Sequence, residues 1–570
     1  MFSFSRIIRR LTRRTYKDLE IDPDEVMLDS SNLPEFDVHQ FEGRIERPIS
    51  RISIWSVGIF FVLIIGMFAY RIWSLQVTNG PLYAEKSEKN RLRPSLIFAS
   101  RGVVYDRNNT LLAWNSVNPK NPDVSNREYI DVSGVGNLLG YVKYPTKDKT
   151  GFYFREDFVG LDGVEKVFND SLVGKNGVKL TETDALGHIT GESQSQPPKD
   201  GAPLYLSVDV RLQSALHDFI QATAHEVGFS GGAGVFMDVH SGEVLALATY
   251  PEYNSKVLTD GTDSAKINSY TTDPNRPFLN RAVNGLYTPG SIVKPFVALG
   301  ALTESIIDPA KEILSTGSIS IQSPYNPDVK SVFTDWKAHG WVDMRTALAV
   351  SSNVYFYEVG GGFEGQRGLG ITKLEKYYRM FGFGEVVPGD FFAGTSGIIP
   401  DPEWKKKNFK GEEWRLGDTY YTSIGQYGFQ ATPLQAARAV SAIANDGTLL
   451  TPVITRLGQD EATSAEVLPI DKDAILVVKE GMRKGVLMGT AKGLNIPQVE
   501  IAAKTGTAEL GVSKEKVNSW VIGFFPYKNP RYAFAVTMEK GSRHNVIGAL
   551  FVVRQFIEWM SVNTPEYLAE

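Results

Sequence analysis

Ser291 and Lys294 are the two residues whose types and spacing most directly suggest chemistry. They lie in the apolar stretch 287–302, which a Pro-Gly turn opens and which is predicted to form a helix. Residues three positions apart lie on one face of a helix, so the hydroxyl and the amine can meet. A serine is a weak nucleophile at neutral pH until a base accepts its proton. A lysine can be that base where burial among apolar neighbours lowers its pKa.

A second polar segment supplies groups that such a reaction needs. Ser351 and Asn353 lie at or near the end of a helical run predicted for 342–357. The Ser351 hydroxyl can relay a proton between Lys294 and a leaving amine. The Asn353 amide can form a hydrogen bond with a substrate amide.

The third segment, Lys504-Thr-Gly-Thr507, lies at the edge of a predicted apolar strand. Lys504, Thr505 and Thr507 can bind a carboxylate. Gly506 keeps the strand free of side-chain bulk, so a peptide can lie close against it. The backbone N–H groups of Ser291 and Thr507 can together form an oxyanion hole.

Each segment alone is a weak signal, because short patterns recur by chance. Second copies occur at 513–516 in a charged run, at 30–32 in the N-terminal tail and at 149–151 in a charged loop. Only the set led by Ser291, Ser351 and Lys504 has each member in a suitable element. This order of nucleophile, Ser-x-Asn and Lys-Thr-Gly is the signature of penicillin-binding proteins and serine β-lactamases.

The chain resembles a class B penicillin-binding protein, a membrane-anchored D,D-transpeptidase of bacterial peptidoglycan synthesis, over nearly everything after residue 50. The motifs that carry the resemblance are 101–108 and 160–165 for the pedestal, 206–213 for the start of the transpeptidase domain, and 280–282 with 289–295 for the nucleophile. The stretches that resemble the elongation type (penicillin-binding protein 2) more than the division type are 402–405, 417–419 and 423–435. Ser352 replaces the aspartate of Ser-Asp-Asn, at a position that varies in the family. The pedestal between 115 and 159 is short for the elongation type, so the resemblance does not define its distal end.

The resemblance implies a specific reaction. Lys294 takes the proton of Ser291, which attacks the carbonyl of the penultimate D-Ala of a peptidoglycan stem peptide. The N–H groups of Ser291 and Thr507 hold the oxyanion, and Ser351 helps to pass the proton to the leaving D-Ala. An amine of a neighbouring stem then attacks the acyl-enzyme and forms the cross-link. β-Lactams acylate Ser291 in place of the stem, with their carboxylate on the Lys-Thr-Gly-Thr segment.

Three alternatives stay open: a division-type transpeptidase, a D,D-carboxypeptidase or β-lactamase-like hydrolase on the same fold, and a non-enzymatic wall scaffold or β-lactam sensor. The presence of Ser291 and Lys294 disfavours the last. No sequence feature assigns a deacylating base, and a β-lactamase needs neither anchor nor pedestal. No cofactor is expected. Some relatives hold zinc between the first two motifs, where Asp335 and His339 lie here. Without a cysteine a complete matching site is not expected, and we interpret both as surface polar residues.

A membrane anchor is predicted at 52–70, which has no charged residue and is long enough to cross a bilayer. The arginine-rich residues 1–17 form either an interfacial helix or a disordered tail, followed by a polar tail at 18–46. These arginines favour a cytoplasmic N-terminus, which places the catalytic part outside the plasma (inner) membrane. The resemblance implies a polytopic glycosyltransferase partner. Gly58 and Gly66 either let a partner helix approach or simply face lipid.

The composition sets broader limits. A chain of 570 residues is expected to form two or more domains, and 42% hydrophobic residues suit packed domains. A net charge of −5 gives no sign of a nucleic-acid partner. The absence of cysteine excludes disulfides and thiolate chemistry. The predicted domains are a cytoplasmic tail (1–51), a transmembrane helix (52–72), a pedestal (73–204) and a transpeptidase domain (205–563).

The predicted fold class is α+β: an antiparallel sheet flanked by helices, preceded by an elongated β-rich pedestal and one transmembrane helix. In the pedestal we expect a hairpin at 101–113 and a loop at 192–203. Beyond residue 205 we expect helices at 208–227, 342–357, 434–445 and 545–560, a hairpin at 234–248, and strands at 499–507, 519–525 and 532–538.

Overall fold

The computed structural model describes residues 50–119, 121–149, 153–183, 189–322, 326, 328–458 and 463–569. The chain falls into two compact units, 1–91 and 92–570. The interfacial helix considered for 1–17 and the polar tail at 18–46 lie outside the described residues. The bounds of the four predicted domains remain predictions.

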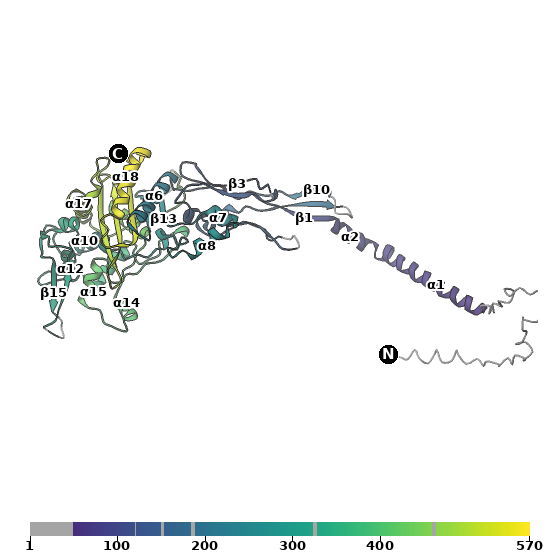
Figure 1. Ribbon diagram of the computed structural model, residues 1–570, viewed down its shortest axis with the longest axis horizontal. Helices are drawn as coiled ribbons and strands as arrows, with labels where there is room; N and C mark the ends of the chain where they lie inside the picture. The colour runs from purple at the N-terminus through teal and green to yellow at the C-terminus, as the bar shows by residue number, and fades with distance from the viewer. Residues whose placement is uncertain are drawn as a thin grey trace, which may run out of the picture. The chain divides into compact units, whose positions relative to one another are not determined.

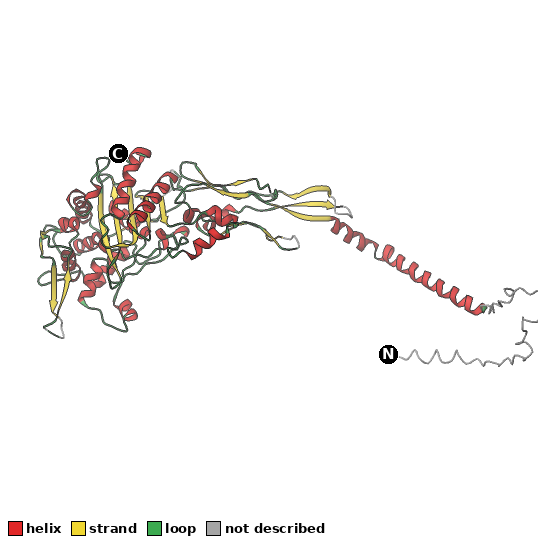
Figure 2. Ribbon diagram, viewed as in Figure 1, coloured by secondary structure: helices red, strands yellow, loops and turns green. Residues whose placement is uncertain are grey.

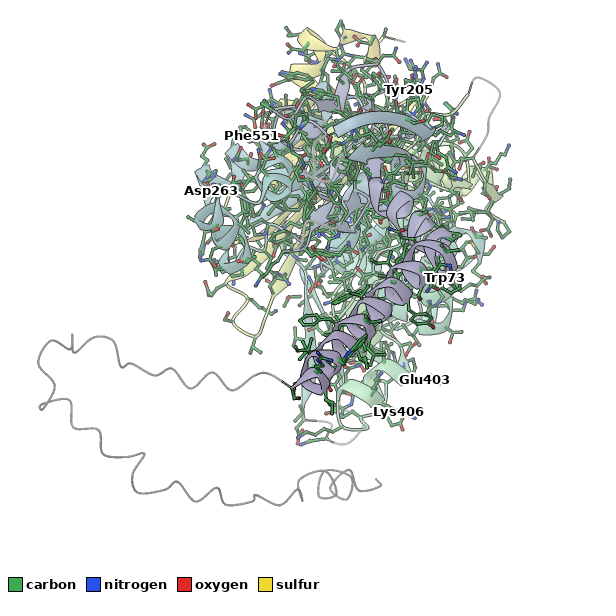
Figure 3. All side chains as sticks on the ribbon, turned by 90° about the vertical axis from the view of Figure 1, so that its right-hand side faces the viewer. Trp73, Tyr205, Asp263, Glu403, Lys406 and Phe551 are labelled. Carbon is green, nitrogen blue, oxygen red and sulfur yellow. The ribbon has the colours of Figure 1, made fainter. Side chains whose placement is uncertain are left out.

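The described part of the first unit is almost entirely helical. Its elements are α1 (Arg51–Trp73), the π-helical turn η6 (Ser74–Thr78) and α2 (Gly80–Arg91). At the start of α1 the Ser50 hydroxyl accepts a hydrogen bond from the Ser53 N–H at 3.1 Å, which satisfies one free donor of the first turn. No side chain of α1 is buried. The side chains of this helix, Trp73 among them, project outward from it (Figure 3). The helical residues 51–78, which contain an 18-residue window with a mean hydropathy of 2.4, are long and apolar enough to cross a membrane. The helix predicted at 52–70 is confirmed.

Short antiparallel strands dominate residues 92–205. One sheet has the order β1-β9-β10, formed by Leu92–Ile97, Gly177–Thr183 and Ile189–Gln196. A second has the order β11-β2-β3-β4, formed by Leu204–Tyr205, Val104–Tyr105, Leu111–Ser116 and Asn126–Tyr129. The smaller elements are β5 (Val142–Lys143), β6 (Thr146–Lys147), β7 (Tyr153–Arg155), β8 (Val159–Gly160), α3 (Gly136–Leu139), α4 (Gly163–Val167) and α5 (Asn169–Leu172). β2 and β3 form the predicted hairpin, whose turn is closed by Asp106 Oδ1 accepting from the N–H groups of Asn108 at 2.8 Å and Thr110 at 2.7 Å.

The loop predicted at 192–203 is wrong for 192–196, which belong to β10 and pair with β9. Residues 192, 193, 195 and 196 are exposed. A strand without a buried face needs no alternation of apolar and polar residues, so its backbone pairing left no pattern in the sequence.

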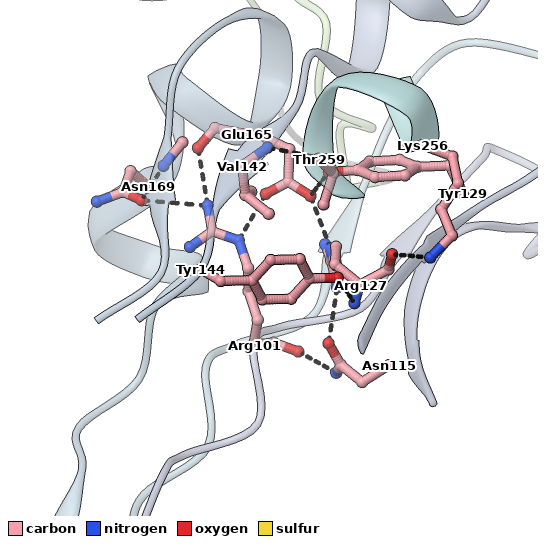
Figure 4. Close-up of polar contacts among 11 residues, drawn as sticks. Arg101, Asn115, Arg127, Tyr129, Val142, Tyr144, Glu165, Asn169, Lys256 and Thr259 are labelled. Carbon is pink, nitrogen blue, oxygen red and sulfur yellow. Dashed lines mark hydrogen bonds and ion pairs between the residues drawn. The ribbon is translucent and has the colours of Figure 1, made fainter. Parts of the chain in front are cut away.

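A buried ionic cluster ties three stretches of this region together (Figure 4). Glu165 of α4 accepts from Arg101 Nε at 2.6 Å and from Arg127 Nε at 2.7 Å, and all three side chains are 0 or 1% exposed. Asn115 donates to the Arg101 carbonyl at 2.6 Å and accepts from Arg127 Nη1 at 3.3 Å. One carboxylate thus serves two buried guanidinium groups.

Helix α7 (Ser255–Asp260), which comes after residues 92–205 in the chain, extends this cluster. The Thr259 hydroxyl donates to the Tyr129 hydroxyl at 3.3 Å, and Tyr129 donates to Glu165 Oε1 at 3.4 Å. The Val142 N–H donates to Thr259 Oγ1 at 3.2 Å (Figure 4). The β-rich region and the larger lobe are therefore joined by buried polar contacts.

The larger lobe is built on a five-stranded antiparallel sheet of order β13-β12-β22-β21-β20 (Figures 1 and 2). Its strands are β12 (Gly231–Asp238), β13 (Val244–Tyr250), β20 (Ala502–Leu510), β21 (Lys516–Phe525) and β22 (Tyr532–Ser542). Successive residues of β12 face opposite sides: Val235 packs in the core that includes α10 and α16, and Phe236 in the core of α6 and α18. Both faces of the sheet are therefore covered by helices.

The remaining helices are α6 (Val210–Val227), α8 (Ser264–Thr272), α9 (Arg281–Asn284), α10 (Lys294–Thr303), α11 (Met344–Val350), α12 (Asn353–Gly361), α13 (Gly370–Met380), α14 (Pro402–Asn408), α15 (Leu416–Ser423), α16 (Pro433–Ala444), α17 (Lys472–Met488) and α18 (Ala549–Asn563). The small strands are β14 (Ile313–Ser315), β15 (Ser318–Gln322), β16 (Lys330–Thr334), β17 (Gly340–Val342), β18 (Thr448–Leu450) and β19 (Ala465–Val467). The α+β class, the hairpin at 234–248 and the three C-terminal strands are confirmed. The single helix predicted at 342–357 is wrong, because α11 and α12 are separated at Ser351.

Candidate active site

Ser291 lies in a 3₁₀ turn, η7 (Gly290–Val293), which leads directly into α10. Gly290 has φ +58°, and a side chain there would also approach the Thr507 carbonyl oxygen to 3.1 Å. Pro295 lies in the first turn of α10, where its missing N–H is not needed. These residues present the half-buried Ser291 at the start of an apolar helix, as predicted.

Lys294 is completely buried one turn beyond Ser291. Its Nζ donates to the Ser351 carbonyl at 2.8 Å and to Asn353 Oδ1 at 2.7 Å, and lies 3.4 Å from Ser351 Oγ. A neutral amine has two N–H donors and one lone pair, so the two short contacts use both donors and leave the lone pair free. Burial lowers the pKa of Lys294 to about 7, against the opposing effect of the nearby Asp335 carboxylate. A large fraction of Lys294 is therefore neutral at neutral pH.

Within the described chain, the Ser291 hydroxyl has no hydrogen-bond partner. The spacing of Ser291 and Lys294 predicts a direct contact, and the structure brings both residues to one turn without that bond. Catalytic hydrogen bonds often shorten only in the complex with the substrate. The free lone pair of Lys294 leaves room for this contact.

Ser351 connects the two lysines of the site. Its backbone is left-handed (φ +59°) and ends α11, while Ser352 begins α12 by accepting from the Tyr355 N–H at 3.3 Å. A left-handed serine costs about 1 kcal/mol, which the surrounding contacts must offset. In this conformation the Ser351 hydroxyl accepts from Lys504 Nζ at 2.8 Å and lies close to Lys294. The arrangement suits a proton relay.

Lys504 is held on strand β20 and is 1% exposed. Besides Ser351, its Nζ donates to the Thr505 carbonyl at 2.8 Å. Burial lowers its pKa well below the ordinary value, and the positive charge of Lys294 acts in the same direction. The Thr505 hydroxyl donates to Thr490 Oγ1 at 2.6 Å, and Thr507 is exposed. Thr490 is a partner that sequence patterns did not reveal.

The structure gives Gly506 an internal role. A side chain there would approach the Pro289 carbonyl oxygen to 2.8 Å and Ile292 Cγ2 to 2.9 Å. The missing side chain thus lets β20 lie against the turn that carries Ser291. β20 is also the last strand of the sheet, so its outer edge can pair with an extended peptide.

Asp335 and His339 are interpreted from the sequence as surface polar residues, but their side chains are buried, at 0% and 2% exposed. Asp335 Oδ2 accepts from Ser352 Oγ at 2.8 Å, from the Val354 N–H at 3.0 Å and from Ser315 Oγ at 3.3 Å. The carboxylate therefore fixes the break between α11 and α12. Sequence patterns could not reveal this role, because the contacts join segments distant along the chain.

This pair does not fit a zinc site. His339 Nε2 lies 3.7 Å from Asp335 Oδ1, and both Asp335 oxygens already accept hydrogen bonds from the protein. Zinc in proteins usually has three or four nitrogen, sulfur or oxygen ligands from side chains. Among the described residues no group of three or more His, Asp or Glu side chains could hold a metal ion.

Replacing Asp335 with asparagine is expected to lower the acylation rate about tenfold, because the amide cannot accept all of these hydrogen bonds. Since the carboxylate raises the pKa of Lys294, its loss should also shift the acid limb of the rate–pH profile to lower pH. The profile is measured by stopped-flow acylation with a chromogenic β-lactam. Ser315→Ala, which removes a contact but no charge, is the control. An unshifted limb in Asp335→Asn would refute the electrostatic part of this role.

Two protein-family descriptions and a curated relative match this chain. The family description "Penicillin binding protein transpeptidase domain" matches residues 232–550, and "Penicillin-binding Protein dimerisation domain" matches 122–206. The peptidoglycan D,D-transpeptidase MrdA of Acinetobacter baumannii is 28% identical, over 93% of this chain and 90% of its own length.

Two solved structures are similar over most of the chain. A complex between penicillin-binding protein 2 and MreC from Helicobacter pylori matches with a TM-score of 0.68 and 26% identity, over 83% of this chain and 99% of that one. A structure titled "Structural coordination of polymerization and crosslinking by a peptidoglycan synthase complex" matches with a TM-score of 0.68 and 25% identity, over 89% of this chain and 97% of that one.

Proposed function

This chain belongs to the penicillin-binding protein transpeptidase family, and from that membership we propose that it is a peptidoglycan D,D-transpeptidase of the cell-elongation type. The similarity to MrdA and to penicillin-binding protein 2 supports the activity and the elongation role. The observation that carries the proposal is the buried Lys294, whose two N–H donors are engaged and whose pKa is lowered to about 7, one turn from Ser291.

The reaction begins with proton transfer. The lone pair of Lys294 accepts the proton of Ser291, and the Ser291 oxygen attacks the carbonyl carbon of the penultimate D-Ala. Backbone N–H groups of Ser291 and Thr507 stabilise the negative charge on the carbonyl oxygen. The peptide bond then breaks, and the proton passes from Lys294 through the Ser351 hydroxyl to the departing amine of D-Ala.

The same groups serve the second half of the reaction. An amine from a neighbouring stem peptide attacks the acyl-enzyme, gives up its proton to the Lys294–Ser351 pair and releases Ser291. The substrate carboxylate lies on Thr505 and Thr507, near the buried Lys504 side chain. Asn353 orients a substrate amide, and its Oδ1 meanwhile holds Lys294 at 2.7 Å. A β-lactam follows the first half of this path and acylates Ser291.

The competition between amine and water tests this activity. The protein is incubated with a D-Ala-D-Ala stem peptide and an amine-bearing acceptor stem, and both products are measured by mass spectrometry. Formation of cross-linked peptide in excess over the hydrolysed donor is expected. Hydrolysed donor alone, across acceptor concentrations, would instead identify a D,D-carboxypeptidase. Ser291→Ala should form neither product.

The apolar helix 51–78 anchors the protein in the plasma (inner) membrane, with the N-terminus in the cytoplasm and residues 92–570 outside. The cysteine-free chain allows a direct test of this orientation. An impermeant maleimide should label Val117→Cys, at an 82% exposed position, on intact spheroplasts. It should label Ser30→Cys only after lysis. The reverse pattern would refute this orientation, and the wild type is the unlabelled control.

A polytopic glycosyltransferase is the proposed partner of the membrane helix. The similar structure whose title couples polymerization with crosslinking supports such a partnership. On α1 the space around Gly58 and Gly66 is open within 4 Å, so a neighbouring helix can approach there. Exchange of both glycines for leucine should reduce co-purification of the partner from membranes and leave β-lactam acylation unchanged. Unchanged co-purification would remove this face from the contact.

A further inference from the structure

A cavity of about 160 Å³ lies at one end of the large sheet, beside the segment that carries Ser291. The residues that define its chemistry are Arg276, Thr288, Gln430, Leu510, Asn518 and Lys540. At about 30 Å³ per water molecule, this space holds about five waters, which is enough for a carboxylate-bearing side chain.

Three segments of the chain that reach the active site also line the cavity. Thr288 comes three residues before Ser291, and Leu510 ends the strand that carries Thr507. Gln430 follows Gly425, whose carbonyl oxygen accepts from the Gly290 N–H at 3.0 Å. At about 3.3 Å per strand residue, Leu510 lies about 10 Å along the strand from Thr507. Three of the chain segments that converge at Ser291 thus converge again at the cavity.

The one carboxylate in the cavity wall is already neutralised. Glu539 is 4% exposed. It accepts from Arg281 Nε at 2.8 Å and from the Tyr287 hydroxyl at 3.2 Å, and pairs with Lys540 Nζ at 3.2 Å. Burial raises the pKa of Glu539, but Arg281 and Lys540 together hold it below its ordinary value. Arg281 alone supplies one full positive charge, so Lys540 brings a second cation to this single carboxylate.

The remaining polar groups of the wall are mainly donors. Arg276 is exposed, and in the described part of the chain it forms no ion pair. The Asn518 Oδ1 accepts from the Lys540 N–H at 3.1 Å, which leaves the Asn518 amide N–H groups for a ligand. The Gln430 amide and the Thr288 hydroxyl add further donors. Two cations and several neutral donors suit a carboxylate.

We infer that this cavity binds a carboxylate on the donor stem peptide, at the second residue on the N-terminal side of D-Ala-D-Ala. The inference rests on the proposed transpeptidase function. A peptide that pairs antiparallel with β20, with its C-terminal carboxylate at Thr505 and its reacting carbonyl at Ser291, extends its N-terminal side toward Leu510. The penultimate D-Ala then lies near Thr507, and the residue two positions before it lies about 7 Å further along, near the cavity mouth.

Two synthetic donors test this inference. Both end in D-Ala-D-Ala and differ only in a carboxylate or a carboxamide at that second residue. A charge-assisted hydrogen bond contributes more than a neutral one, so the wild type should prefer the carboxylate donor about tenfold in kcat/KM. The double variant Arg276→Gln/Lys540→Gln should reduce this preference to less than about twofold. Because the preference is a ratio within one protein, it does not depend on the fraction of folded enzyme.

Lys528→Gln, which changes a 77% exposed lysine outside the cavity, is the matched control and should keep the full preference. Acylation by benzylpenicillin distinguishes a failure of the cavity assignment from a failure of the proposed transpeptidase function. Equal kcat/KM for the two donors in a wild type that penicillin acylates would overturn the cavity assignment alone. A preference that survives in the double variant would overturn the role of the two cations. A wild type that penicillin does not acylate would overturn the function itself.

Discussion

Exchange of Lys294 for methionine is expected to lower the rate constant for acylation by a β-lactam about 10³-fold at neutral pH. General-base catalysis contributes 10²–10⁴-fold, and Lys294 is the one lysine in the stretch 287–302 that carries Ser291. Methionine keeps the size and burial of the side chain, so the fold should persist. The measurement is stopped-flow acylation under single-turnover conditions.

The chain offers a matched control for this variant. Lys516 follows Ser513 with the same spacing but is exposed at the start of β21, so Lys516→Met should acylate at the wild-type rate. Equal rates for Lys294→Met and Lys516→Met would remove Lys294 as the base.

The role of Lys294 as the base also determines how the acylation rate depends on pH. Only neutral Lys294 accepts a proton, so the wild-type rate should fall about tenfold per pH unit below about 7 and level off above it. Lys294→Arg, whose side chain stays charged at all accessible pH values, should be inactive without recovery at high pH. Recovery of Lys294→Arg at high pH would contradict the assignment.

Exchange of Glu165 for alanine is expected to have the largest effect on stability, about 3–5 kcal/mol of unfolding free energy. It leaves Arg101 and Arg127 buried without the carboxylate that they share, and an uncompensated buried charge is costly. Chemical denaturation followed by circular dichroism measures the shift of the transition that includes this region.

An exposed ion pair in the same region provides the control. Glu192 pairs with Lys179 at 3.2 Å, with side chains 49% and 33% exposed. Glu192→Ala should change the unfolding free energy by less than about 1 kcal/mol. If Glu165→Ala destabilises the protein no more than Glu192→Ala, the buried cluster does not hold this region together.

The elements with a clear hydrophobic period were predictable from the sequence. The strands 519–525 and 532–538 and the helix 434–445 are buried, and burial leaves a pattern that the sequence retains. The described residues 192, 193, 195 and 196 of strand β10 are exposed, and the strand left no such pattern. Ser351 could not be assigned to a helix break, because its left-handed backbone depends on Asp335 and the two lysines.

In the active site, too, some residues were predictable from the sequence and others were not. The chemical types of Ser291, Lys294 and Lys504 predicted their grouping, because a serine nucleophile needs a nearby base such as a lysine. The supporting contacts of Asp335 and Thr490 come from segments far away in the chain. The packing role of Gly506 was also missed, because it permits a close approach to Pro289 of the protein itself. Such tertiary contacts have no local signature.

The most direct test of the central claim is intact-mass analysis of acylation by a β-lactam over time, on the wild type and on Ser291→Ala. A stable adduct of the β-lactam mass on the wild type alone is predicted. An adduct that disappears within seconds would indicate a hydrolase. An adduct on both proteins, or on neither when both are shown to be folded, would contradict the assignment of Ser291 as the nucleophile.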